Sequence, residues 1–179
     1  YLVGECITCM ELDVTLDVED GCIELGVGVY VGSNRMPGDA AMGEPDFQLN
    51  KFFYKRVGKN HRWIDRLTWS DEKWINYISN RNLETYIISE SCDLAGFFEL
   101  LHNPELEETE ISYFGLLEEY IGKGIGGYAL STAIKKSFEK NIRRVWLHTC
   151  TLDHPNALKN YIARGMTVFK KEKINILDS

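Results

Sequence analysis

The sequence lacks several features that would assign it to a familiar class of protein. It has no run of about 18 or more apolar residues, so nothing predicts a membrane-spanning helix. Positive charge is scarce, since 20 Lys and Arg stand against 27 Asp and Glu, and the net charge of −7 argues against a nucleic-acid partner. The four histidines show no metal-ligand spacing, so we expect no metal.

The cysteines do not form a disulfide framework. They number five, an odd count without regular spacing, which fits a reducing cytoplasm. Cys6-Ile-Thr-Cys9 is a C-x-x-C, but a zinc ribbon would need a second such pair, and a redox motif would be followed by a helix. Two thiols in a strand is the preferred interpretation. With no signal-peptide pattern visible, we expect a cytoplasmic protein.

The composition is that of an ordinary globular protein. The chain has 179 residues, of which 44% are hydrophobic and 26% charged, enough for one domain over 1–179 with its own core. Within it we expect an N-terminal hairpin over 1–31, a flexible loop over 32–45 that is rich in Gly and Pro, and a core over 46–179.

The hairpin is predicted from alternation. Apolar and polar residues alternate over 10–18 and again over 23–31, which is typical of strands with one buried face. Asp20-Gly21 lies between the two runs and is a common hairpin turn.

The core alternates between helical and extended patterns. These predict helices at 46–57, 70–78, 128–140 and 155–164, and strands at 86–89, 94–101, 109–116, 144–150 and 166–171. The simplest packing is an α/β fold with one central sheet and helices against it.

A glycine-rich turn is the most distinctive stretch of the core. Leu116 to Gly127 reads Leu-Leu-Glu-Glu-Tyr-Ile-Gly-Lys-Gly-Ile-Gly-Gly and joins an extended run to a helical one. The N-terminus of a helix offers unpaired N–H groups and a partial positive charge, and glycine lets the backbone approach an anion closely. We therefore expect this turn to hold the diphosphate of a nucleotide-bearing cofactor.

Two common phosphate motifs fit poorly. The turn satisfies the dinucleotide fingerprint G-x-G-x-x-G if Gly127 is its third glycine. That fold also needs an acidic residue about 20 positions later, and Arg144 to Cys150 contains none. The P-loop pattern fails because no Gly-Lys-Ser/Thr closes the turn.

The turn instead resembles motif A of the GNAT superfamily of acetyl-CoA-dependent N-acetyltransferases, Arg/Gln-x-x-Gly-x-Gly/Ala. Gly124 and Gly126 match, whereas Ile121 stands where the family usually has Arg or Gln. A second stretch, 157–166, is similar to the family's motif B, Ala-x-x-x-Tyr-x-x-x-Gly-Phe, with His154 where that motif often begins with Asn. The order of elements in the core also follows the family, and the closest likeness is to a bacterial small-molecule subgroup.

The resemblance implies a mixed, mainly antiparallel sheet with helices on both faces, and acetyl-CoA as co-substrate without a metal. The backbone near Leu116 would pair with pantetheine and the acetyl oxygen, and Lys123 would add charge at the diphosphate. The expected cofactor-binding residues are Leu116, Leu117, Ile121, Gly122, Lys123, Gly124, Ile125, Gly126, Gly127 and Asn156.

Catalytic residues follow from the same resemblance. Tyr161 falls on the family's general-acid position, four residues before the motif B glycine, and the alternative is a tyrosine packed on the sheet. Glu110 opens the strand before the glycine turn, on the same face as Ser112 and Phe114 by alternation, and is the candidate base. Glu99 on the preceding strand is its rival, and a solvated carboxylate is the alternative for both.

The resemblance also implies an acceptor site between the first two helices of the core, and a packed, hydrogen-bonded helix junction is the alternative for this segment. Trp63, Asp65 and Arg66 lie there, with Glu99 as a further candidate, and an aromatic ring beside a carboxylate suits a cationic amine. We therefore predict transfer of an acetyl group to a primary amine of a small molecule. The alternative is a non-catalytic acyl-CoA-binding module whose hairpin docks a partner. The sequence leaves the oligomeric state open, with a homodimer among the options.

Overall fold

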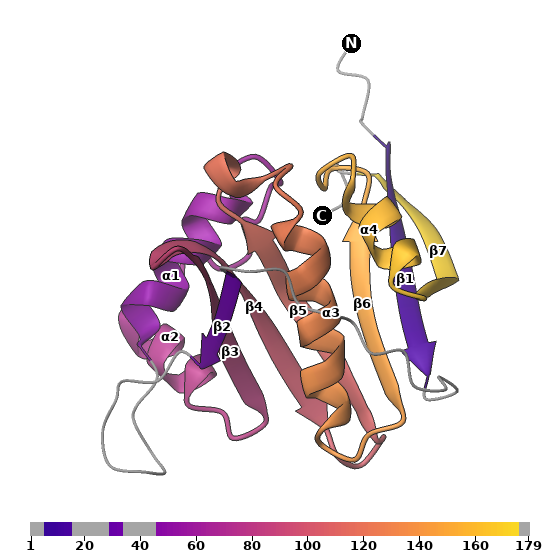
Figure 1. Ribbon diagram of the computed structural model, residues 1–179, viewed down its shortest axis with the longest axis horizontal. Coiled ribbons are helices and arrows are strands. Elements are labelled where there is room, and N and C mark those ends of the chain that lie inside the picture. The colour runs from indigo at the N-terminus through magenta and orange to yellow at the C-terminus, as the bar shows by residue number, and fades with distance from the viewer. Residues whose placement is uncertain (1–5, 16–28, 34–45, 176–179) are drawn as a thin grey trace.

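The computed structural model describes residues 6–15, 29–33 and 46–175, which build one seven-stranded sheet and four α-helices (Figure 1). In chain order the elements are β1 Cys6–Thr15, β2 Val29–Ser33, α1 Phe47–Gly58, α2 Asp71–Ile78, β3 Leu83–Glu90, β4 Asp93–Asn103, β5 Glu108–Leu116, a 3₁₀ turn Glu118–Tyr120, α3 Ile125–Phe138, β6 Arg144–Cys150, α4 Ala157–Ala163 and β7 Thr167–Asn175. No helix among these is long and apolar enough to cross a membrane.

The order of strands across the sheet is β2-β3-β4-β5-β6-β1-β7. Every neighbouring pair is antiparallel except β5 and β6, which run parallel. The expected mixed, mainly antiparallel sheet is therefore confirmed.

The prediction of an N-terminal hairpin is wrong. β1 pairs with β6 and β7, whereas β2 pairs with β3 at the opposite edge of the sheet, so the two strands never meet. The local alternation correctly indicated strands, but their partners are set by long-range packing that alternation does not encode. The expected turn at Asp20-Gly21 and residues 34–45 of the expected loop lie outside the described residues.

The first two helices begin at caps that the sequence shows. Asp46 accepts backbone N–H bonds from Gln48 and Leu49, and Ser70 accepts one from Lys73. These bonds satisfy N–H groups that would otherwise have no partner in the first turn, which fixes where each helix starts. At the other end of the chain, Gly165 has φ +84° just after α4, a conformation that favours glycine.

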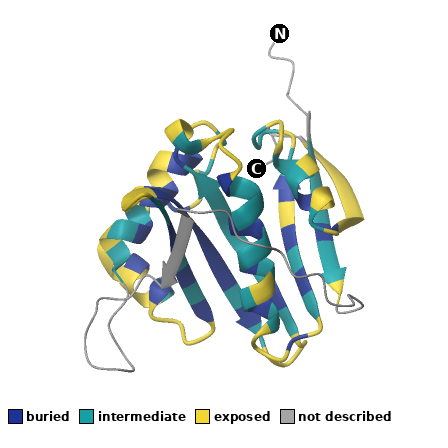
Figure 2. Cartoon of the chain, in the orientation of Figure 1, coloured by how far each residue is buried: buried dark blue, intermediate teal, exposed yellow. Residues whose placement is uncertain are grey.

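The helices cover both faces of the sheet, as expected. Adjacent residues of β4 point to opposite sides: Phe97 stacks on Phe53 of α1, and Phe98 packs in the larger core beneath α3. α3 crosses one face in the foreground of Figure 1, and β4 is buried without interruption over residues 95–100 (Figure 2). β7, at the edge, is exposed along most of its length.

One arginine fastens β1 into the sheet. The Arg144 guanidinium of β6 contacts Asp13 of β1 at 2.8 Å and Glu108 of β5 at 2.9 Å, and lies over the ring of Phe169 of β7. Four strands therefore meet at a single side chain. Leu12 of β1 is fully buried in the larger core, so the N-terminal strand is an integral part of the fold.

Candidate active site

The site lies where the two parallel strands separate. The pairing of β5 with β6 covers Glu108–Glu110 and Arg144–Trp146 and ends there. Beyond that point, residues 111–116 of β5 and 147–150 of β6 line opposite walls of a cavity of about 640 Å³. We call this cavity the fork. A gap between parallel strands leaves backbone groups without sheet partners, which a ligand in extended conformation can meet.

A β-bulge on β5 shapes one wall of the fork. Glu99 of β4 pairs with Tyr113, and the next residue, Leu100, pairs with Ile111, so Ser112 is the extra residue. Ile111 and Phe114 consequently share the α3 face, which strict alternation would forbid. The expectation that Glu110 lies on the face of Phe114 is therefore wrong, because the bulge reverses the alternation between them.

The fork thus opens to both faces of the sheet. On the α3 face its lining includes Phe114 and Tyr161 from the larger core. On the α1 face it includes Val57, Trp63 and Tyr113, from or against the smaller core. A ligand can therefore enter from each side and meet another between the strands.

The glycine turn forms the α3 side of the fork. Gly122 and Gly124 have φ of +82° and +80°, a left-handed conformation that side chains disfavour. Gly124 is the N-cap of α3 and provides no side-chain cap, so the first N–H groups of the helix are left to a ligand. The partial positive charge of this helix end favours an anion.

Most of the expected cofactor-binding residues meet at this turn. Those that line the fork are Leu116, Ile121, Gly122, Gly124, Gly126, Gly127 and Asn156. Leu117 and Ile125 do not line it, because their side chains are buried in the two cores. Lys123 is half exposed and lies over the ring of Tyr120, with its ammonium 3.9 Å from the carboxylate of Glu90.

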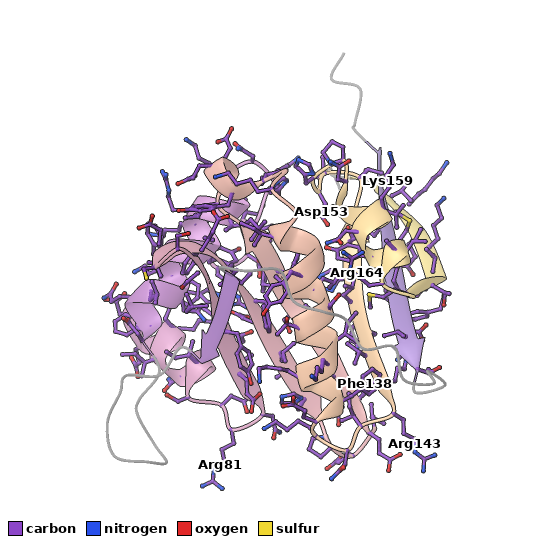
Figure 3. The ribbon with its side chains drawn as sticks, in the orientation of Figure 1. Arg81, Phe138, Arg143, Asp153, Lys159 and Arg164 are labelled. Carbon is purple, nitrogen blue, oxygen red and sulfur yellow. The ribbon has the colours of Figure 1, made fainter. Side chains whose placement is uncertain are left out.

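One side chain of α4 and one from the residue that follows it hold the helix against the first turn of α3. Asn160 donates to the carbonyl of Gly126 at 3.2 Å, and Arg164 donates to the carbonyl of Gly127 at 3.1 Å. A Cβ at Gly127 would meet the Arg164 guanidinium, so a larger residue here would require the end of the Arg164 side chain to move. Figure 3 shows Arg164 between the two helices, with Asp153 near their upper ends.

Tyr161 of α4, the expected general acid, lines the fork on the α3 face. Its side chain is buried, and burial, followed by the nearby charges of Asp153 and Cys150, raises the pKa of its hydroxyl. The hydroxyl therefore stays protonated over the whole working pH range, which is the state that a proton donor needs. Asp153 itself is held by the hydroxyl of Thr149 and the backbone N–H of Cys150.

Two of the four residues expected at the acceptor site line the fork on the α1 face. Trp63 packs edge-on against Tyr113, with ring centroids 4.7 Å apart, and Asp65 is exposed to the cavity. The Asp65 carboxylate accepts hydrogen bonds from the hydroxyls of Tyr54 at 2.6 Å and Tyr113 at 2.9 Å. Burial and the bond to Asp65 raise the pKa of Tyr54 to about 12, so this tyrosine remains a donor.

The other two residues, Arg66 and Glu99, do not reach the fork. They form a two-pronged ion pair at 3.0 and 3.1 Å, with Arg66 4% and Glu99 0% exposed, and the hydroxyl of Tyr77 donates to Glu99. Burial is the largest single influence and lowers the pKa of Arg66, but the charge and the hydrogen bonds of Glu99, together with Tyr77 and Tyr113, outweigh it, so the net shift is upward. The guanidinium also lies over the rings of Tyr54, Trp69, Trp74, Tyr77 and Tyr113. We call this group the buried ion-pair cluster.

Glu110 lies at the point where the strands separate. Its carboxylate is 3.3 Å from Nδ1 of His148, and it is His148 that lines the fork. Glu110 is the largest influence on His148 and, against the effect of burial, raises the pKa of the imidazole. The sequence showed His148 only as an isolated histidine beside the expected site. Alternation along β6 could have placed it on one face with Trp146, but nothing local connects it to Glu110.

The N-terminal strand also contributes to the fork. Cys9 of β1 lines it beside Cys150 of β6, the residue that it faces across the ladder. Sequence reasoning missed this because the partner of β1 was not foreseeable from local patterns. Within the described ranges, no group of three or more His, Cys, Asp and Glu side chains is placed to hold a metal ion.

The family can now be stated, because a family model described as "Acetyltransferase (GNAT) family" matches residues 49–166. The chain belongs to the GNAT acetyltransferase family. None of the curated proteins compared with this GNAT chain matches it.

Solved structures show the same fold at low identity. A GCN5-related N-acetyltransferase from Sphaerobacter thermophilus is 16% identical with a TM-score of 0.67, covering 94% of this chain and 52% of that one. One from Kribbella flavida is 15% identical with a TM-score of 0.60, over 92% and 55%. An aminoglycoside acetyltransferase from an uncultured soil metagenomic sample, in complex with trehalose, is 13% identical with a TM-score of 0.60, over 79% and 90%. The GNAT chain thus spans about half the length of the first two proteins.

Enzymes of the GNAT family generally use acetyl-CoA. The residues at the α3 side of the fork fit such a ligand. An uncapped helix end with glycines around it suits a diphosphate, and the exposed backbone of β5 suits an extended amide chain.

Proposed function

We propose that this GNAT chain transfers an acetyl group from acetyl-CoA directly to a primary amine of a small molecule. One observation carries the proposal: the uncapped N-terminus of α3 and the buried Tyr161 open into the same cavity, at the fork of β5 and β6. In this proposal they act as an anion site and a protonated acid around one extended binding path. Acetyl-CoA supplies the thioester, and the protein supplies position and proton transfer.

The two faces of the fork have separate roles in this proposal. On the α3 face, the backbone of Ile121 to Gly127 holds the diphosphate. The presence of isoleucine at position 121, in place of the usual Arg or Gln, therefore costs little binding affinity. On the α1 face, the fixed carboxylate of Asp65 and the ring of Trp63 attract a cationic amine. Negative charge at this mouth agrees with the net charge of −7.

The chemistry then follows from the placement. The neutral amine attacks the thioester carbonyl, a C–N bond forms, and the C–S bond breaks. Tyr161 gives its hydroxyl proton to the departing thiolate and recovers one from the new amide nitrogen, directly or through water. The other proton of the original ammonium leaves at the Glu110–His148 end of the fork, so the overall reaction releases one proton.

Incubation with acetyl-CoA and a panel of amines, with release of free CoA thiol as the signal, tests the proposal. The panel should include polycationic amines such as aminoglycosides, because of the carboxylate at the acceptor side. We expect thiol release with at least one amine. If CoA binds and no amine gives release, the chain is better described as an acyl-CoA-binding module.

Tyr161→Phe tests the acid role within the same assay. The change removes only the hydroxyl, so we expect kcat to fall by about 100-fold while the Kd for CoA stays within about twofold. Equal kcat values for the variant and the parent would assign Tyr161 to packing instead.

A further inference from the structure

The Glu110–His148 pair lies where the proposed reaction needs a proton acceptor. Parallel pairing ends at Glu110 and Trp146, and His148 is two residues beyond Trp146 on the same side of β6. Its side chain is 60% exposed, whereas that of Glu110 is 21% exposed. Of the two, only His148 is among the residues that line the fork.

Each end of the imidazole faces a different environment. Nδ1 is 3.3 Å from the Glu110 carboxylate. Nε2, at the far side of the ring, is then the nitrogen that can meet a ligand in the fork. A carboxylate at Nδ1 stabilises the tautomer with a proton on Nδ1, which leaves Nε2 with a free lone pair.

The location also separates the base from the acid. By the alternation along β6, His148 lies on the face opposite Leu147, which belongs to the core beneath α3. This is the α1 face, where Trp63 and Asp65 line the fork, whereas Tyr161 belongs to the α3 face. A proton can therefore leave the incoming amine on one side while another reaches the departing thiolate on the other.

We infer that His148 is the catalytic base of this enzyme, with Glu110 as the residue that positions it. The inference rests on the proposed function and refines the role expected for Glu110, which acts through the imidazole. Nε2 takes one proton from the R–NH3+ form of the acceptor, giving R–NH2 and an imidazolium paired with Glu110. The imidazolium then returns that proton to solvent through the exposed edge of the ring.

The other charged groups around His148 have different partners. Glu11 of β1 faces it across the ladder but is 3.2 Å from the Lys170 ammonium. Asp153, after the end of β6, is held by Thr149 and the N–H of Cys150. All three carboxylates raise the pKa of His148 in the order Glu110, Asp153, Glu11, while burial lowers it. Glu110 alone is close enough to orient the ring.

The sign of the pH dependence follows from the base role. His148 accepts a proton only when neutral, so kcat/KM must rise as pH increases through its pKa, which is above the ordinary 6.5. Glu110→Gln removes the largest cause of that upward shift. The acid limb of the profile should therefore move to lower pH in this variant, with lower kcat because the tautomer is no longer enforced.

The experiment uses the full chain and compares His148→Asn, Glu110→Gln and Glu11→Gln. We expect His148→Asn to lower kcat/KM by about 100-fold or more without weakening CoA binding, and the smaller variant His148→Ala to regain activity with added imidazole. Glu110→Gln should shift the acid limb, and Glu11→Gln, which removes the same charge from β1, should shift it far less. An unchanged pH profile in His148→Asn would overturn the inference.

NMR titration of the ring nitrogens gives a readout that needs no acceptor. Single His variants identify the four imidazoles. We expect His148 to titrate above 6.5 with the proton on Nδ1 in its neutral form, and to titrate lower in Glu110→Gln. Equal titration in the two proteins would overturn the pairing even if no amine is acetylated. Failure of the acetylation panel alone would contradict the proposed function but leave this measurement decisive.

Discussion

Glu99 and Glu110 lie on neighbouring strands, and their surroundings are opposites. Glu99 is fully enclosed, held by both prongs of Arg66 and by the hydroxyl of Tyr77. Glu110 sits at the edge of a cavity, with one imidazole beside it and solvent beyond. Arg66 keeps its charge because its pKa is raised, whereas the pKa of His148 at the fork lies where the imidazole can gain and lose a proton. In the proposed reaction, the carboxylate that stabilises the fold and the carboxylate that assists proton transfer are therefore different residues.

The largest effect should come from breaking the buried ion-pair cluster. Arg66→Met leaves Glu99 charged and without its cation inside the protein, so we expect the free energy of unfolding to fall by about 3–5 kcal/mol. Urea unfolding followed by circular dichroism measures the loss. The matched change at the fork, Glu110→Gln, should cost less than about 1 kcal/mol because the pair there is partly solvated.

A double variant sharpens that test. Arg66→Met combined with Glu99→Leu removes both charges and fills the space with apolar groups, so most of the lost stability should return. If the double variant is as unstable as Arg66→Met, the aromatic contacts of the guanidinium stabilise the fold, and the ion pair is secondary.

The next effect concerns ligand binding at the fork and should leave the buried ion-pair cluster unchanged. Gly124→Glu places a carboxylate beside the uncapped end of α3, where we expect it to repel a diphosphate and weaken CoA binding by about 100-fold, or about 3 kcal/mol. Calorimetric titration with CoA measures this. Gly124→Asn is the control, since asparagine tolerates a positive φ and adds no charge. Similar CoA affinity for both variants would show that the diphosphate does not bind at this turn.

The smallest effect concerns Cys9, the β1 residue that lines the fork. Thr151 donates its N–H to the carbonyl of Thr8, so Cys9 and Cys150 form the next, non-hydrogen-bonded pair, in which side chains are closest. A mild oxidant should therefore join these two thiols.

Peptide mapping of the oxidised protein identifies the bond, and Cys9→Ser is the control. Both thiols have raised pKa values, mainly through burial, so the reaction should be faster at higher pH. A Cys9 that pairs elsewhere would place β1 differently and restore the hairpin expected from the alternation.

Local signals in the sequence predicted local structure well. α1 and α2 begin where the helical patterns begin, capped by Asp46 and Ser70, and the glycine turn opens α3, because each depends on residues within one turn. The position of Tyr161 followed from its spacing to Gly165. In these cases the cause and the consequence lie within a few residues of each other.

Long-range pairing set what the sequence did not show. The bulge at Ser112 arises from the register between β4 and β5, and it moves Glu110 to the other face. Arg66 and Glu99 were each expected at the acceptor site. Their ion pair depends on the packing of the α1–α2 connector against β4, which the sequence does not show. The role of His148 likewise depends on a contact between two strands that only the fork brings together.

The placement of β1 also determines when the site can exist. Among the described strands, β1 is synthesised first and its partners, β6 and β7, are synthesised last. β1 therefore stays unpaired until they are made. Until then the apolar residues of β1 have no sheet partner, and Cys9 is not in place to line the fork. Contacts between such distant parts of a chain slow folding and prolong exposure to aggregation. The contact between Cys9 and Cys150 can therefore form only after β6 has been synthesised, and the cavity is complete only once that contact exists.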